Sequence, residues 1–211
     1  MTGQSGRKYD RITSWLHAGL ATGVSLELLL QAVMRVPPGV GQGVDDWHRE
    51  AFELHSHFGP TVAVLCLLHW LWICTPWARP GVAYLFPWLK PDQRPALRRE
   101  FRALLRFELP PRESLSPLVG TVHGLGLLAV TASVLGGTVS YLGYYTRVPV
   151  PNPVLHWASL ELIATSWLVW TFVIGHASMA LLHGLRRHPH RPDRSKGYVT
   201  TASPYDPGRR P

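Results

Sequence analysis

Four long apolar runs restrict what this chain can fold into. Each contains at least the roughly 20 residues that a helix needs to cross the hydrocarbon core of a bilayer. The runs cover residues 12–34, 54–77, 118–143 and 156–185. Hydrophobic residues make up 46% of the 211 residues and charged residues only 16%. The sequence therefore predicts an all-α fold, an integral membrane four-helix bundle that occupies residues 1–190 as one domain.

The positive charges predict the orientation of this bundle, because Lys and Arg are retained on the cytoplasmic side of a membrane. Eighteen of the 21 Lys and Arg residues lie in the N-terminal arm, in residues 78–117 or after residue 185. Only Arg35, Arg49 and Arg147 lie in the other two connections. Both termini are therefore expected to be cytoplasmic. The first run has no cleavage site after it, so we interpret it as a membrane helix rather than a signal peptide.

The segments outside the runs carry most of the charge. Residues 95–107 combine arginines with apolar residues at helical spacing, which predicts a basic helix on the membrane surface or, alternatively, a docking surface for a soluble partner. Topology and contact with membrane lipid explain the net charge of +8, so no nucleic acid is expected as a partner. Residues 191–211 are rich in proline without an apolar period and are predicted to form a disordered cytoplasmic tail.

Histidines form two layers in the predicted topology. The cytoplasmic half of the four runs contains His17, His69, His123 and His176, and the external ends contain His55, His57 and His156. Ionisable residues inside membrane spans generally face the bundle interior and mark cofactors, ion paths or relays. Facing helices of a bundle can each supply one imidazole to a haem iron. Two such layers would let electrons cross the membrane.

His17 and His176 are the strongest candidate ligands. Both lie at matching depth among small residues such as Gly19 and Gly175, which leave room for a flat macrocycle but also permit close helix packing without a cofactor. The chain contains no Cys-x-x-Cys-His motif, which excludes covalent c-type haem attachment. Its two cysteines, Cys66 and Cys74, are too far apart on one helix to bridge each other.

The chain resembles a family of bacterial four-helix b-type cytochromes, which includes the cytochrome b subunits of nickel-iron hydrogenases and formate dehydrogenases. The matching motifs are Tyr9-Asp10-Arg11 and Trp15-Leu16-His17 in the first run, His55 four residues before Gly59 in the second, and residues 173–177, Val-Ile-Gly-His-Ala, in the fourth. The likeness covers residues 9–185, although topology and histidine placement carry more of it than the short motifs do.

The resemblance implies an inner haem b held by His17 and His176. It also implies an outer haem between the second and fourth helices, with His55 as the ligand from the second helix. The family's outer ligand on the fourth helix lies about four turns before the inner one. That position, fourteen residues before His176, is Leu162.

The remaining candidate ligands of an outer haem iron are His156, or His57 in place of His55. His156 lies about 200° round a regular helix from His176, so it would need an irregular start of the helix to reach an outer haem. The count of haems is therefore one or two. His69 lies where the family usually places a basic residue near a haem propionate, and it is also an alternative inner ligand.

Three further polar residues lie within the runs. We interpret His123 as a hydrogen-bonding or quinone-site residue before a ligand. Glu27 is either a neutral acid bonded to a neighbouring helix or a proton carrier for quinone chemistry. Glu161 lies nearer the external surface, where it would pair with a histidine or mark a quinol site.

The predicted function is electron transfer by a membrane b-type cytochrome between the quinone pool and a partner redox protein or subunit. The resemblance places it in the bacterial inner membrane, as a multi-pass subunit of a quinone-linked oxidoreductase. Two alternatives stay open. One is a haem-poor or haem-free accessory subunit of a larger membrane complex, and the other is a histidine-lined transporter of metal ions or protons.

Overall fold

The computed structural model describes residues 9–34, 45–106, 116–146 and 148–185. The four long helices are α1 (Arg11–Val33), α2 (Asp46–Ile73), α5 (Pro117–Tyr145) and α6 (Asn152–Leu185). The elements between α2 and α5 are α3 (Val82–Leu85), the 3-10 turn η1 (Pro87–Leu89) and α4 (Arg94–Leu105). All four long helices are long and apolar enough to cross a membrane. The all-helical fold with four candidate spans is thus confirmed, while the predicted tail of residues 191–211 lies outside the described residues.

Helix α2 differs most from the apolar run that marks it. It starts at Asp46, eight residues before the run, because an acidic residue suits a helix N-terminus and Asp46 pairs with Arg49 one turn later at 2.8 Å. It ends at Ile73 rather than at residue 77, since Pro76 disfavours a helical conformation in the residue before it. The apolar run therefore predicted the membrane-crossing part of α2 but not the residues at which the helix begins and ends.

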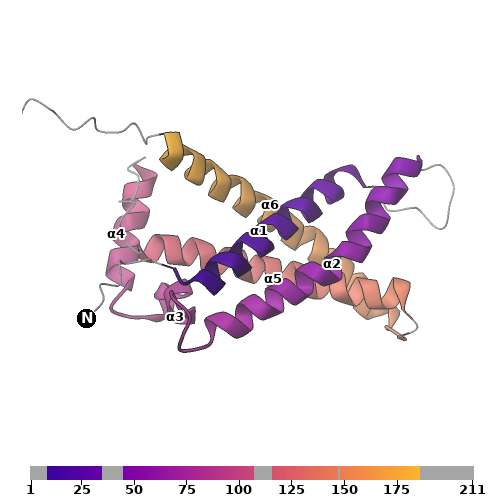
Figure 1. The fold of residues 1–211 in the computed structure, drawn as a ribbon, viewed down its shortest axis with the longest axis horizontal. Coiled ribbons are helices and arrows are strands. Elements are labelled where there is room, and N and C mark those ends of the chain that lie inside the picture. Colours follow the sequence, from indigo (N-terminus) through magenta and orange to yellow (C-terminus); the bar gives the residue numbers. More distant parts are fainter. Residues whose placement is uncertain (1–8, 35–44, 107–115, 147, 186–211) are drawn as a thin grey trace, which may run out of the picture.

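The long helices pack as two antiparallel pairs. Helix α1 packs along α2 and α5 packs along α6, and contacts between α2 and α5 join the two pairs. Helix α6 meets α1 only briefly, and Figure 1 shows the two helices crossing rather than running side by side. The first and the last long helix are therefore held together mainly through the pairs to which they belong.

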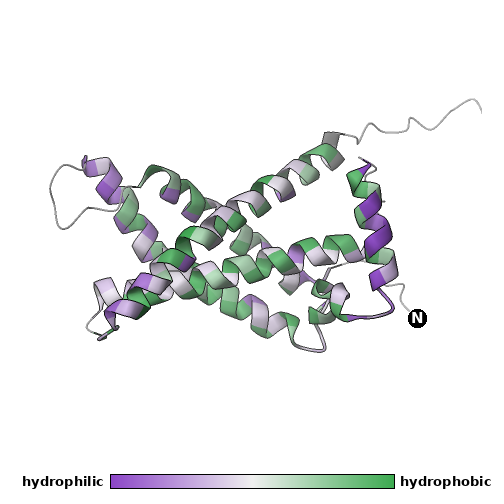
Figure 2. Ribbon diagram, turned by 180° about the vertical axis from the view of Figure 1, so that it is seen from behind, coloured by the Kyte–Doolittle hydropathy of each residue, from purple (hydrophilic) through white to green (hydrophobic). Residues whose placement is uncertain are grey.

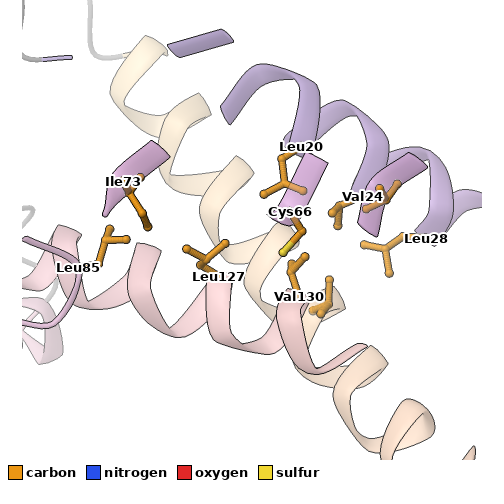
Figure 3. Close-up of a cluster of buried hydrophobic side chains, with 10 residues drawn as sticks. Leu20, Val24, Leu28, Cys66, Ile73, Leu85, Leu127 and Val130 are labelled. Atoms are coloured by element: carbon orange, nitrogen blue, oxygen red, sulfur yellow. The ribbon is translucent and has the colours of Figure 1, made fainter. Parts of the chain in front are cut away.

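The apolar core lies where α1, α2 and α5 meet. Leu20, Val24 and Leu28 of α1 face Cys66 of α2 and Leu127 and Val130 of α5 (Figure 3). The long helices are apolar over much of their length (Figure 2). Many large aliphatic and aromatic side chains are exposed on them. An apolar exterior on every long helix suits lipid rather than water as the surrounding medium.

A polar network joins the start of α1 to the end of α2. The Asp10 carboxylate accepts hydrogen bonds from the backbone N–H of Thr13 at 2.7 Å and of Arg79 at 2.8 Å. The Asp10 N–H in turn donates to the Arg79 carbonyl at 3.0 Å, and the Trp72 indole donates to the Thr13 hydroxyl at 3.0 Å. Asp10, the central residue of the Tyr9-Asp10-Arg11 motif, thus caps α1 and fixes it to the α2–α3 connection.

Candidate functional site

Three imidazoles from three helices meet in one half of the molecule: His17 of α1, His123 of α5 and His176 of α6. We call them the histidine cluster. The nearest nitrogens of the three side chains all lie within 4.8 Å of one another. Ring centroids are 6.2 Å apart for His17 and His176, 5.9 Å for His17 and His123, and 4.9 Å for His123 and His176. Three imidazoles this close form the best candidate ligand set in the described part of the chain.

Antiparallel packing of α5 on α6 creates this meeting. Gly143 faces Leu155, Gly136 faces Glu161 and Gly126 faces Phe172, so the register stays constant over the length of the pair. Continuing that register places His123 opposite His176. Phe172, one turn before His176, stacks on the His176 ring with centroids 5.4 Å apart and an interplanar angle of 23°. The His176 ring is therefore held from two sides.

A backbone hydrogen bond orients His123. Its Nδ1 lies 2.8 Å from the Val119 carbonyl, and because a carbonyl can only accept, Nδ1 must carry the proton. In the neutral ring this leaves Nε2 as the atom with a free lone pair. A histidine whose other nitrogen bonds a backbone carbonyl is the usual arrangement of a metal ligand.

The histidine cluster is accessible beside α1. His17 is exposed and the other two imidazoles are half-buried, since α1 and α6 touch only briefly. A Cβ atom added to Gly175 would meet nothing within 4 Å, so the surface next to His176 is also open. Imidazole nitrogens at this spacing could hold a haem iron, and the open side would leave room for its flat macrocycle.

His69 of α2 lies close enough to His17 and His123 for electrostatic interaction with both. Its side chain is only 8% exposed, and its Nδ1 is buried without a hydrogen-bond partner among the described residues. A buried imidazole nitrogen without a partner is costly, so a ligand group that supplied one would be stabilised at this position.

The histidines of the predicted outer layer do not form a comparable group. His55 of α2 contacts the Glu27 carboxylate of α1 through its Nδ1. His57 is exposed, and its Nδ1 donates to the Glu53 carbonyl one turn earlier at 2.7 Å. His156 is exposed on α6 and lies edge-on to its own neighbour Trp157, with centroids 6.2 Å apart. Within the described ranges, His17 and His176 thus lie together, whereas the recorded contacts of His55 and His156 are to Glu27 and Trp157.

The sequence had indicated a hydrogen-bonding or quinone-site role for His123 before a ligand role. The signal was present, since His123 lies at the same predicted depth as His17 and His176. Depth alone does not give the direction of a side chain round its helix. That direction follows from the register of α5 on α6, which is set by glycines opposite large side chains.

A four-span helical membrane protein with imidazoles of several helices converging inside it belongs to the class that holds redox cofactors between its helices. Comparison with known proteins identifies the family. The family described as prokaryotic cytochrome b561 matches residues 8–191, and the chain belongs to it. This membership makes the chain a membrane haem b protein of electron transport. No curated protein and no solved structure matches the chain.

Proposed function

We propose that His17 of α1 and His176 of α6 would hold the iron of a haem b, and that the chain passes electrons between the quinone pool and a redox partner protein or subunit. The observation that carries this proposal is the histidine cluster, in which these two imidazoles lie 6.2 Å apart. They come from the first and last spans and lie in two of the motifs in which the chain resembles the cytochrome family, Trp15-Leu16-His17 and residues 173–177. A bound haem supplies one-electron iron chemistry, with a potential set by its ligands and the polarity around it.

The protein side chains around this position would do three things. Phe172 holds the His176 ring by stacking, which fixes the direction of its nitrogen. His69 offers a buried imidazole without a partner, suited to binding a polar group at the edge of a macrocycle. The apolar core residues of α1, α2 and α5 would exclude water from the bundle interior and keep the local dielectric constant low.

The basic helix α4 supports a cytoplasmic position for the histidine cluster. It packs against the first part of α5, which also carries His123, so helix and cluster lie at the same end of the molecule. In Figure 2, α4 is the most hydrophilic of the helices, and it contains four of the arginines. Positive charge is retained on the cytoplasmic side. We therefore propose that the chain lies in the inner membrane of a bacterial cell and that this end faces the cytoplasm.

A second candidate function rests on His123. Three imidazoles with nitrogens within 4.8 Å of one another can also hold a first-row metal ion, as in catalytic zinc sites. This arrangement would suit a metal-binding or transport protein rather than a cytochrome. A chain without bound metal or haem would instead be an accessory subunit of a larger membrane complex.

Purified wild-type protein distinguishes these candidates. We expect a b-type absorption spectrum that changes on reduction with dithionite, and haem that is extracted intact by acidic acetone because no covalent bond holds it. Reduction by a quinol in detergent, followed at the haem absorbance, tests the link to the quinone pool. Protein that contains zinc or another metal ion but lacks a haem spectrum would contradict the proposal and support the metal-binding candidate.

A further inference from the structure

The outer layer does not repeat the inner one, and we infer that this chain carries haem at the inner layer only, because α6 has Leu162 at the position where a second outer ligand would be needed. This inference rests on the proposed function and limits it, since it removes the second redox centre. Four observations on α1, α2 and α6 describe the outer layer, and the absent ligand on α6 carries the inference.

The first observation concerns α6. At the position where a two-haem cytochrome of this kind has its outer ligand, four turns before His176, the chain has Leu162, whose side chain cannot bind iron. The nearest histidine, His156, lies within the regular helix rather than before it, because α6 already begins at Asn152. Its ring is exposed and lies beside Trp157 of the same helix. An irregular helix start that would redirect His156 is therefore missing.

The second observation is that His55 has another partner. Its Nδ1 contacts Oε2 of Glu27, and the side chains of the pair are 28% and 12% exposed respectively. An isolated carboxylate in a membrane span is costly, and pairing with the imidazole of a neighbouring helix offsets part of that cost. The pair occupies Nδ1 of His55 and leaves its Nε2 free, so His55 itself could still bind a metal, and the outer position is decided by the missing partner on α6.

The third observation concerns the space beside His55. Gly59, one turn later on α2, belongs to the motif that the chain shares with the cytochrome family. A Cβ atom at Gly59 would lie 4.0 Å from Oε1 of Glu27. This is an ordinary van der Waals distance, so the Glu27 carboxylate lies beside Gly59 on this face of α2 without filling the space next to it.

The fourth observation is the helix arrangement. The inner helices α1 and α6 meet only briefly, so a lack of helix contact does not by itself exclude a haem. An outer haem would bridge α2 and α6, which form no extended interface within the described ranges and carry His55 and His156 in their N-terminal parts. Figure 1 shows their N-terminal ends at separate corners of the molecule. At the inner layer, by contrast, α5 brings His123 against His176 and within reach of His17.

A single inner haem changes how the chain handles electrons. His55 and His69 mark the two layers on α2 and are fourteen residues apart, about 20 Å along a helix. With no redox centre in the outer layer, electrons would enter and leave at the inner layer. The donor and the acceptor would then meet this chain at the same end, and the chain would not conduct electrons across the membrane.

The stoichiometry of haem tests the inference directly. We expect one haem per polypeptide in the full-length wild-type protein by pyridine haemochrome and amino-acid analysis, and one single-electron wave in a redox titration. Two haems, or two waves of equal size, would overturn the inference while leaving the proposed function intact. Protein with no haem would instead overturn the proposed function, so the two failures are distinguishable.

Variants and vesicles add independent readouts. His55→Asn, Glu27→Gln and His156→Ala should each keep the wild-type haem content, and loss of haem from folded His55→Asn or His156→Ala protein would contradict the inference. Wild-type protein in quinone-free vesicles with trapped ferricyanide should not speed its reduction by external dithionite beyond the rate of protein-free vesicles. A clear increase in that rate would also contradict the inference, and the vesicle test does not depend on the folding of any variant.

Discussion

The imidazoles of His123 and His176 lie edge to face across the α5–α6 interface, with ring centroids 4.9 Å apart. The same interface places the Glu161 carboxylate of α6 against Gly136 of α5, near the other end of the pair. Both Glu161 carboxyl oxygens are buried without hydrogen-bond partners in the described part of the chain. One packing register therefore sets the inner histidines and also buries an acid in the outer half.

Variants of the histidine cluster separate ligands from neighbours. His17→Ala and His176→Ala should each lose most of the haem, because a single remaining imidazole holds iron weakly. His123→Ala should keep its haem but lower haem affinity about 10-fold, as the loss of an outer-shell partner commonly does. Haem absorbance per polypeptide after detergent purification measures both effects.

The matched control is His156→Ala, which removes an exposed histidine from the same helix as His176. Its haem content should equal that of the wild type, and circular dichroism should show the same helix content in all four variants. If His123→Ala loses as much haem as His176→Ala while His17→Ala retains it, His123 and not His17 is the second ligand.

Close packing of α5 on the α3 segment gives a second prediction. A Cβ atom at Gly124 would overlap the backbone carbonyl of Leu85, which cannot move aside as a flexible side chain can. Gly124→Ala should therefore lower the free energy of unfolding by about 1–3 kcal/mol. Gly137→Ala is the control on the same helix, because its new methyl group would meet nothing within 4 Å. Thermal unfolding in detergent compares them, and equal midpoints would show that the two helices are not packed this closely.

The four spans could be predicted from the sequence, because the thickness of the bilayer sets the length of the apolar run that a spanning helix needs. The sequence was also sufficient to single out His17 and His176, whose depth and small neighbours were visible in the chain. It was not sufficient for His123, since the rotation of α5 relative to α6 depends on which side chains interlock. The identity of the partner of Glu27 could not be predicted for the same reason, because the contact joins residues of different helices.

The Glu27–His55 pair predicts a measurable coupling. Glu27→Ala and His55→Ala should each destabilise the protein, because each leaves a buried polar partner behind. The double variant should be less destabilised than the two single effects added together, by about 0.5–3 kcal/mol. Unfolding of the three variants and the wild type in detergent completes the cycle. Additive effects would mean that the two side chains do not interact in the membrane protein.

Acid stability tests the cap of α1. Partial burial acts to raise the pKa of Asp10, but hydrogen bonds from the Thr13 hydroxyl and from the backbone amides of Arg79 and Thr13 outweigh it and lower the pKa to about 2. In the unfolded chain the pKa of an aspartate is about 3.9. The folded state thus binds the Asp10 proton less readily than the unfolded state does. The contribution of Asp10 to stability is complete above about pH 4 and is lost as the pH falls towards 2.

Asp10→Asn removes this titration while keeping a side chain of similar shape. The variant should be less stable than the wild type at pH 7, and the difference between them should shrink between pH 4 and pH 2, because the wild-type carboxylate becomes protonated there. Comparing the two proteins at each pH cancels the effects of the other carboxyl groups. A stability difference that stays constant down to pH 2 would show that the carboxylate charge of Asp10 does not support the link between α1 and the α2–α3 connection.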